Sequence, residues 1–251
     1  MADKHKKRII LGSGIPAICI PIVEKEKEGI LKEARRLNGY PCDLVEWRAD
    51  FFEGWENHEA VAEVLDGLRG CLGERGILFT FRTADEGGNS SITPEAYAAL
   101  NRAAASTGVP DFIDVELIRL GDAGGALVHD IQRQGVQVIG SNHDFAKTPE
   151  KQELIGRLTR MQSLGADVAK LAVMPQSKAD VITLLDATRE KKRQSPDYPI
   201  ITMSMGRLGM PSRLTGALYG SALTFGTAGQ ASAPGQIPAE LLAEVLQLLG
   251  E

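Results

Sequence analysis

The sequence predicts an α/β fold of the (β/α)8 TIM barrel type. Eight short apolar segments recur along the 251 residues, and segments with helical periodicity lie between them. Most of the apolar segments are nearly continuous rather than alternating, which is typical of parallel strands covered on both faces. The chain also has the usual length of one such barrel. We therefore expect residues 1–251 to form a single barrel domain.

The eight predicted strands are rich in β-branched and other apolar residues. They are residues 17–22, 44–47, 77–81, 112–116, 137–141, 168–173, 200–203 and 222–225. The first strand is not followed by a G-x-G-x-x-G turn, which argues against an open dinucleotide-binding sheet, and the strand count favours closure. Before it, apolar residues 9–11 and 15–18 flank Gly12-Ser13-Gly14. This pattern predicts a short N-terminal β-hairpin that covers the barrel floor.

Three helices are indicated by apolar residues repeated every three or four positions. Their stripes are Val61, Val64, Leu65, Leu68 and Leu72; then Leu154, Leu158 and Met161; and finally Leu241, Val245 and Leu248. Thr93-Pro94 and Thr148-Pro149 each predict a capping hydroxyl before a proline at the first helical position. Ser177 precedes Asp180 by three residues, which predicts a third helix start.

Composition excludes several classes of protein. The net charge of -5 argues against a nucleic-acid binder, which needs a basic face. No apolar run approaches the roughly 20 residues of a membrane helix, and the basic start lacks a signal-peptide core. Cys19, Cys42 and Cys71 lack metal-ligand spacing, so we expect reduced packing residues. We therefore expect a soluble cytoplasmic protein with neither nucleic-acid nor membrane partners.

Unusual polar residues gather where the predicted strands end. They are Glu46, Arg48 and Asp50 in the second strand region, Arg82 and Glu86 after the third, Asp114 and Glu116 in the fourth, Asn142, His143 and Asp144 after the fifth, Lys170 in the sixth, and Arg213, Ser232 and Gln236 in the last loops. Active sites of this fold lie at the carboxyl ends of the strands. We expect the site there, where Met203, Met205 and Phe225 form either its apolar wall or ordinary core.

Lys170 is the most informative single residue, because it lies inside an apolar strand. Desolvation disfavours its charged form, so the side chain must be paired or neutral. One interpretation is a structural lysine that pairs with an interior carboxylate such as Glu116 or Asp114. The other is a neutral amine that attacks a carbonyl and forms an imine.

His143 follows the neighbouring strand and is a candidate acid–base group, because an imidazole can take and return a proton near neutral pH. A hydrogen-bonded core histidine is the alternative. Glu86 is either the carboxylate that orients this imidazole or a loop residue in solvent. The small-residue segment 226–236 is either an anion-binding loop or a lid that excludes water.

Three arginines fall at the same rim. Arg48, Arg82 and Arg213 together suit recognition of a carboxylate or phosphate. Individually each can be an ordinary salt-bridge partner, and Arg48 with Glu46 or Asp50 is the obvious case. The sequence thus predicts a site for a small, negatively charged keto compound.

Together these stretches resemble the type I 3-dehydroquinate dehydratases of the shikimate pathway. The motifs are residues 44–50 (LVEWRAD), 114–117 (DVEL), 138–144 (VIGSNHD), Lys170 and residues 231–236 (ASAPGQ). The resemblance runs from about residue 17 to 249. Pro21 departs from the pattern, because some relatives have a substrate-contacting serine at the end of the first strand.

The resemblance implies a carbon–oxygen lyase that dehydrates 3-dehydroquinate to 3-dehydroshikimate through a Schiff base on Lys170. It implies that His143 removes the proton and protonates the departing hydroxyl in a syn elimination, with Glu86 orienting it. Substrate is then held by Glu46, Arg48, Arg82, Arg213, Ser232 and Gln236. It further implies a homodimer that needs no metal or organic cofactor. The alternatives are a class I aldolase on the same barrel and a catalytically silent ligand-binding barrel.

Overall fold

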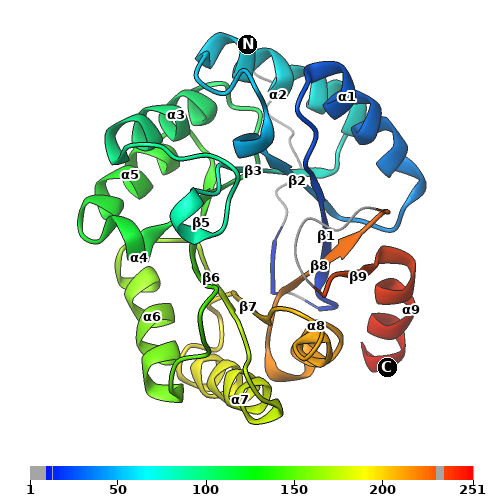
Figure 1. Ribbon diagram of the computed structural model, residues 1–251, viewed down its shortest axis with the longest axis vertical. Coiled ribbons are helices and arrows are strands. Elements are labelled where there is room, and N and C mark those ends of the chain that lie inside the picture. The colour runs from blue at the N-terminus through cyan, green and yellow to red at the C-terminus, as the bar shows by residue number, and fades with distance from the viewer. Residues whose placement is uncertain (1–9, 13, 230–234, 251) are drawn as a thin grey trace.

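The strands form one curled parallel sheet in the order β7-β6-β5-β4-β3-β2-β1-β8-β9. The computed structural model describes residues 10–12, 14–229 and 235–250. β1 pairs with β8, and at the remaining seam the backbone N–H of Ala222 donates to the Ile200 carbonyl at 2.8 Å. The first eight strands therefore close into a barrel, and the helices form a ring around it (Figure 1). This arrangement confirms the predicted TIM barrel.

The strands lie close to their predicted positions. They are β1 (Ala17–Ile22), β2 (Leu44–Arg48), β3 (Gly76–Thr80), β4 (Phe112–Val115), β5 (Gln137–Asp144), β6 (Val168–Val173), β7 (Ile200–Ser204), β8 (Leu223–Thr227) and β9 (Ile237–Pro238). The bounds of β1 and β6 agree with the prediction, and the largest difference is the longer β5. The two-residue β9, which was not predicted, pairs with the end of β8 beyond the barrel.

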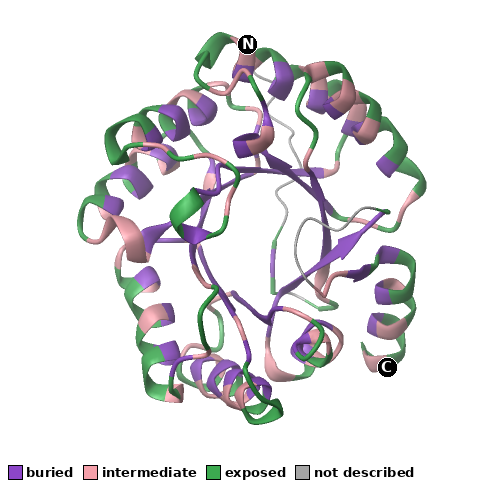
Figure 2. Ribbon diagram, viewed as in Figure 1, coloured by how far each residue is buried: buried purple, intermediate pink, exposed green. Residues whose placement is uncertain are grey.

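The helices follow the strands in alternation. They are α1 (Lys27–Arg36), α2 (His58–Leu72), α3 (Pro94–Ser106), α4 (Leu117–Leu120), α5 (Ala123–Gln132), α6 (Lys151–Ser163), α7 (Lys178–Gln194), α8 (Met210–Thr215) and α9 (Ala239–Gly250). Their buried faces point toward the strands and their exposed faces point outward (Figure 2). None of the helices in the described part of the chain is long and apolar enough to span a bilayer.

The barrel interior is built in layers, because every second residue of a strand points inward. A lower layer is apolar: Leu44, Leu78, Phe112, Ile139, Val168, Ile201 and Leu223. Two residues further along the same strands lie Glu46, Thr80, Asp114, Ser141, Lys170, Met203 and Phe225, which are buried but mostly polar. The barrel thus has an apolar floor and, toward the carboxyl ends of its strands, a polar upper half.

The predicted N-terminal hairpin is wrong for the residues that the structure describes. Within 10–12 and 14–16 the chain forms a turn and a bend, and the first described strand begins at Ala17. Gly12 has a φ of 87° and Gly14 one of 91°, so the backbone turns at both glycines instead of extending as a strand. Leu11 nevertheless packs on the interior apolar layer and covers the barrel floor.

Two helix starts agree with prediction and one does not. The Thr93 side chain accepts from Ala96 N at 3.2 Å, and Ser177 and Asp180 form a capping box. By contrast, α6 begins at Lys151 after Glu150, and the buried Thr148 hydroxyl has no hydrogen-bond partner among the described residues. Residues 148–149 therefore belong to the preceding loop.

The predicted buried stripe of α9 is also wrong. Leu241 is 48% exposed and Leu248 is 73% exposed, whereas Ala239, Leu242 and Leu246 are buried. Leucines occur in adjacent pairs along this helix, so apolar periodicity alone is compatible with either face. Packing against the barrel buries the face that carries Leu242 and Leu246, which is offset by one residue from the predicted face.

Candidate active site

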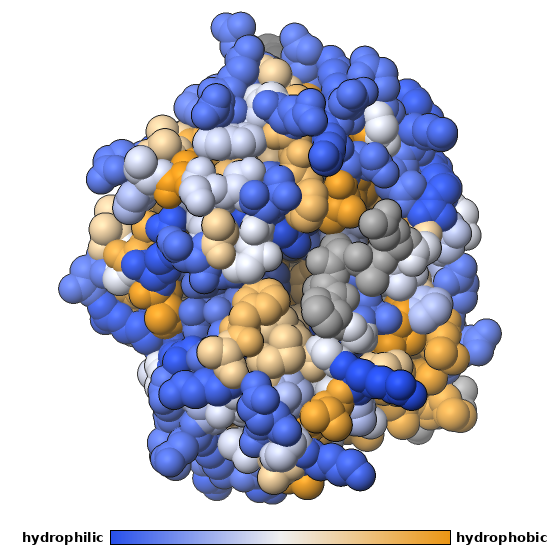
Figure 3. All heavy atoms as spheres, in the orientation of Figure 1, coloured by the Kyte–Doolittle hydropathy of each residue, from blue (hydrophilic) through white to orange (hydrophobic). Residues whose placement is uncertain are grey.

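A pocket opens at the carboxyl ends of the barrel strands. Its lining residues are Glu46, Arg48, Arg82, Glu86, Gly87, His143, Phe145, Lys170, Ala172, Met203, Met205, Arg213, Phe225 and Gln236. Figure 3 shows the molecule hollowed near its centre, with apolar side chains beside the hollow and mostly hydrophilic side chains toward the edge of the molecule. The structure therefore brings together eight of the nine predicted site residues, and Ser232 lies outside the described residues.

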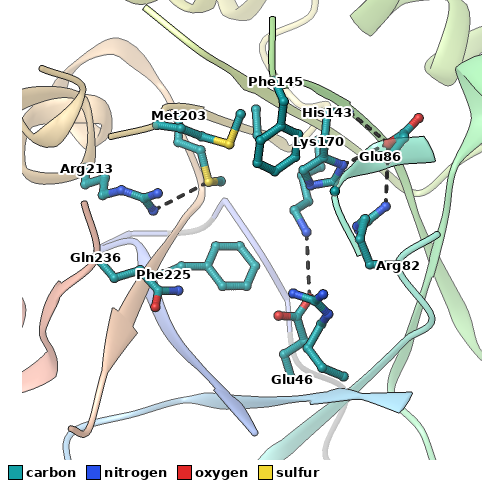
Figure 4. Close-up of a pocket in the computed structure, with 14 residues that line it drawn as sticks. Glu46, Arg82, Glu86, His143, Phe145, Lys170, Met203, Arg213, Phe225 and Gln236 are labelled. Carbon is teal, nitrogen blue, oxygen red and sulfur yellow. Dashed lines mark hydrogen bonds and ion pairs between the residues drawn. The ribbon is translucent and has the colours of Figure 1, made fainter. Parts of the chain in front are cut away.

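Lys170 projects from β6 into this pocket and is 3% exposed. Its Nζ lies 3.1 Å from Asp114 Oδ2 and 3.8 Å from Glu46 Oε1, and 4.7 Å from the Phe225 ring centroid. The amine is directed toward Glu46 (Figure 4). The predicted pairing with an interior carboxylate is therefore present, and Asp114 is the closer partner. The same amine also faces the cavity.

His143 and Glu86 form a hydrogen-bonded pair beside the lysine (Figure 4). Glu86 Oε2 lies 2.9 Å from His143 Nδ1 and accepts the His143 backbone N–H at 2.9 Å. Its Oε1 accepts from Asn142 Nδ2 at 3.1 Å. Glu86 lies in a 3₁₀ turn, Ala84–Glu86, and is buried rather than solvated. This arrangement fixes the imidazole ring through Nδ1.

Burial and neighbouring charges change the acid–base properties of both groups. Burial, together with the positive charges of Arg82, Lys170 and Arg48, holds the pKa of His143 well below its usual value. The imidazole is therefore neutral around pH 7. Burial raises the pKa of Glu86 to about 7, although Arg82 opposes this shift. A neutral imidazole with Nδ1 directed at a carboxylate keeps the lone pair on Nε2, the tautomer that a general base needs.

Arg82 is the centre of a buried ion-pair network. Its Nη2 lies 2.8 Å from Asp114 Oδ1, and its Nη1 donates to Glu116 Oε1 at 2.9 Å and to Ser141 Oγ at 3.1 Å. Glu86 Oε2 is 3.6 Å from the same Nη1. This guanidinium therefore organises the carboxylates beneath the pocket as well as lining it.

Arg48 forms the salt bridge that the sequence suggested with Asp50. Its Nε and Nη2 each donate to one Asp50 carboxylate oxygen at 2.8 Å. Asp50 is fully buried and also accepts the backbone N–H groups of Arg82 and Asn89. The bidentate pair holds the guanidinium at the pocket wall.

Arg213 comes from α8 on the opposite side of the pocket (Figure 4). It is 3% exposed, and burial lowers its pKa to about 10, so it still carries a positive charge at pH 7. Its Nη1 lies 3.6 Å from the Met203 sulfur. A buried guanidinium at a cavity wall favours an anionic ligand.

Gln236 lines the pocket at the end of the small-residue segment 226–236. Gly235 before it has a φ of 78°, and a Cβ there would lie 2.2 Å from the Gly206 carbonyl oxygen. Only glycine permits this close approach, which places Gly235 against the loop after β7 and Gln236 directly after it. The predicted lid or anion-binding role of residues 230–234 falls outside the described residues.

Sequence reasoning missed Phe145, which lies one residue beyond β5 at the mouth of the pocket (Figure 4). Phe145 is 42% exposed. Its ring packs so closely on Gly87 that a Cβ added to this glycine would lie 2.3 Å from the nearest ring carbon. The signal available was an aromatic residue directly after the polar end of a strand. Pro21 is buried next to Glu46 in the sheet register and is not among the described residues that line the cavity.

The residues that converge here suit covalent carbonyl chemistry coupled to proton transfer. In the described ranges, no group of three or more His, Cys, Asp or Glu side chains could hold a metal ion. The three cysteines are free thiols, and Cys19 is buried in the barrel interior.

Comparison with known proteins decides the family. A family model described as type I 3-dehydroquinase matches residues 18–251. The chain belongs to the type I 3-dehydroquinase family. The 3-dehydroquinate dehydratase of Clostridioides difficile strain 630 is 49% identical over 243 residues, which cover 97% of this chain and 95% of that protein. The 3-dehydroquinate dehydratase of Syntrophotalea carbinolica is 47% identical over 249 residues, which cover 99% of this chain and 98% of that protein.

Solved type I 3-dehydroquinase structures agree with this fold. The type I 3-dehydroquinate dehydratase of Clostridium difficile, which carries covalently modified comenic acid, gives a TM-score of 0.93 at 49% identity, covering 98% of this chain and 96% of that one. The 3-dehydroquinate dehydratase of Enterococcus faecalis gives a TM-score of 0.90 at 40% identity, covering 97% of this chain and 98% of that one. The chain is therefore a hydro-lyase of the shikimate pathway that acts on 3-dehydroquinate, and dehydration is favoured over the aldolase and silent-barrel alternatives.

Proposed function

We propose that this chain dehydrates 3-dehydroquinate in the pocket at the carboxyl ends of its strands, through an imine on Lys170. The observation that carries the proposal is a buried amine that faces a cavity beside a His143–Glu86 pair. The covalently modified ligand in the Clostridium difficile structure supports covalent chemistry at this kind of site. The product is 3-dehydroshikimate.

In the first step the neutral form of Lys170 uses its nitrogen lone pair to attack the ketone carbon. The C–O π electrons move to oxygen, and the resulting carbinolamine loses water to give an iminium. Overall, an ammonium and a ketone become an iminium and water, so charge and protons balance. The iminium is the electron sink that acidifies the adjacent C–H bond.

His143 then acts at the adjacent carbon. Its Nε2 removes the acidified proton, and the C–H electrons move toward the iminium nitrogen to give an enamine. The enamine electrons then form the new C=C bond and restore the iminium as the C–O bond to the hydroxyl breaks, and the imidazolium protonates that hydroxyl so that it leaves as water. Both transfers occur on the face that His143 occupies, which is a syn elimination. Water adds to the remaining imine and releases the product from Lys170.

Glu86 orients His143 only when it is ionised. A protonated Glu86 would donate to Nδ1, place the imidazole proton on Nε2 and remove the base. Because the pKa of Glu86 is about 7, kcat/KM should rise as pH increases through about 7. The pKa of His143 lies too far below its usual value to produce this limb itself.

Glu86→Gln should therefore lose the acidic limb near pH 7 and lower kcat by about 10- to 100-fold, because the ring is held less firmly. Glu86→Asp keeps a titratable group and is the matched control. Profiles of kcat/KM between pH 5 and 9 check this prediction. An unchanged limb in Glu86→Gln would assign the titration to another group.

The substrate carboxylate binds to Arg213 in this proposal, because a buried cation at the cavity wall gains most from an anionic ligand. Substrate hydroxyls and the carboxylate are held by the rest of the predicted set. That set is Glu46, Arg48, Arg82, Ser232 and Gln236. Ser232 rests on sequence resemblance alone.

Arg213→Met should raise KM for 3-dehydroquinate by about 10- to 100-fold, the effect of losing a charge-assisted hydrogen-bonded pair. The change in kcat should be smaller, because Arg213 does not act on the reacting bonds. Arg207→Met, which removes an exposed arginine nearby in the sequence, is the control. Equal KM values for Arg213→Met and wild type would remove Arg213 from carboxylate binding.

The decisive test of the proposal is intact mass after incubation with 3-dehydroquinate and borohydride, followed by peptide mapping. A reduced adduct on Lys170 supports the Schiff base. A folded protein that turns over 3-dehydroquinate without any adduct would contradict it.

We also propose that residues 1–251 act as one catalytic domain in a cytoplasmic homodimer. The free thiols are compatible with a reducing compartment, and the family resemblance favours the dimer. Sedimentation velocity of the purified chain distinguishes a dimer from a monomer.

A further inference from the structure

Asp114 is the carboxylate nearest to the Lys170 amine, yet it is not among the described residues that line the pocket. It projects from β4 into the barrel and is fully buried. Its Oδ2 accepts from Lys170 Nζ at 3.1 Å. Its Oδ1 accepts from Ser141 Oγ at 2.5 Å and from Arg82 Nη2 at 2.8 Å. Both oxygens are thus fixed, one by two donors and the other by the reacting nitrogen.

The environment keeps Asp114 ionised. Burial alone would raise the pKa of this carboxyl, but the charges of Arg82 and Lys170 and the hydrogen bond from Ser141 outweigh it, and the pKa lies below its usual value. A carboxylate held in this state is a poor proton acceptor. Its stable contribution is a negative charge at the Lys170 nitrogen.

We propose that Asp114 is the counter-ion of the protonated imine on Lys170, an inference that rests on the Schiff base proposed above. When the ammonium and the ketone become the iminium and water, the nitrogen keeps one N–H and its positive charge. That N–H takes the place of the ammonium hydrogen now bonded to Oδ2. Asp114 therefore acts on a reacting atom while remaining out of contact with the rest of the substrate.

The iminium needs this partner because several cations surround it. Arg48, Arg82 and Arg213 all line the pocket, and each disfavours a proton on the imine nitrogen. A neutral imine is a weak electron sink, so loss of that proton would stop removal of the C–H proton. A fixed negative charge in contact with the nitrogen opposes the three arginines.

Other groups around the nitrogen are less well placed for this task. Glu46 is farther away, at 3.8 Å, accepts from Thr80 Oγ1, and faces the ligand space. Glu86 is bonded to His143, and Glu116 is bonded to Arg82 and Thr83. His143 is neutral near pH 7, and burial raises the pKa of the Cys19 thiol and of the Tyr97 phenol, so both are neutral as well.

The test uses the His143→Ala protein, in which the imine should accumulate because elimination is blocked. With lysine labelled at Nζ with ¹⁵N and with 3-dehydroquinate added, NMR reports whether the imine nitrogen carries a proton at each pH. Adding Asp114→Asn should lower the pH at which this proton is lost by about 1 to 3 units. Glu116→Gln, which removes a buried carboxylate of the same network without a contact to Nζ, should shift it much less.

Turnover gives a second readout in otherwise unmodified protein. Asp114→Asn should move the alkaline limb of kcat to lower pH by the same amount, with loss of kcat larger at pH 9 than at pH 6. A merely structural role would lower kcat equally at every pH. If Asp114→Asn does not fold, the counter-ion role is tested in the His143→Ala protein by itself. An imine nitrogen that carries no proton at pH 7 in that protein would overturn this role.

The two proposals fail differently. An imine that forms on Lys170 but keeps its proton equally well in Asp114→Asn overturns the role of Asp114 and leaves the Schiff base intact. If neither protein forms an imine, the Schiff base and the counter-ion role are both overturned.

Discussion

Replacing Lys170 by methionine is expected to lower kcat at least about 10⁴-fold and to abolish the borohydride-trapped adduct. The reaction depends on an iminium to acidify the C–H bond, and no other lysine lines the pocket among the described residues. Losses of this size follow when a covalent catalyst is removed from a site whose other residues act through it. Steady-state kinetics and intact mass with borohydride check the two halves of the prediction.

Methionine keeps much of the lysine's aliphatic volume, so the barrel interior should remain packed. Asp114 loses one partner but keeps Arg82 and Ser141, which still satisfy its other oxygen. The control is Lys191→Met, because Lys191 is similarly buried, at 2%, but lies on α7 and bonds to Gln162 outside the pocket. Wild-type turnover by a folded Lys170→Met protein would end the imine mechanism for this chain.

Alternation along the strands explains how much of this architecture the sequence could reveal. Strand positions followed from continuous apolar runs, and polar residues at their ends indicated where the site would lie. The period of two within each strand then places Leu44, Glu46 and Arg48 in successive inward layers. The same period relates Val168, Lys170 and Ala172, so the depth of the lysine was contained in the sequence.

Partners within the site could not be predicted, because they depend on geometry between strands. Arg82 can pair with any nearby acid, and only the fold selects Asp114 and Glu116 while leaving Asp50 to Arg48. Glu86 lies in a short turn whose position over His143 depends on two loops from different strands. Loop geometry of this kind has no periodic signal in the sequence.

The errors at the two ends of the chain have a similar cause. Gly12 and Gly14 permit a hairpin, but they equally permit the observed turn, and contacts with the barrel floor decide between them. On α9, Leu241 and Leu242 are adjacent, and the helix buries only the second. In both places local preference is weak, and tertiary packing determines the outcome.

Replacing His143 by alanine separates the two halves of the proposed reaction. The Lys170 amine and its contact with Asp114 remain, so the variant should still form the borohydride-trapped adduct with 3-dehydroquinate. Dehydration should fall by about 10³- to 10⁴-fold, near the upper range for general acid–base catalysis, because one imidazole serves both proton transfers. Product absorbance and intact mass, measured on the same samples, give the two values.

This combination is specific to an acid–base role that follows imine formation. A histidine that only supports the pocket would, on removal, weaken adduct formation and dehydration together, since both depend on the same cavity. Loss of Nδ1 leaves Glu86 bonded to the Asn142 side chain and the His143 backbone N–H, which the substitution retains, so the turn should hold its position. His129→Ala, which removes an exposed imidazole on α5, should leave both measurements unchanged. Unimpaired dehydration by His143→Ala would require another group to move the proton, and Glu86 would be the first to test, because its pKa of about 7 suits a base.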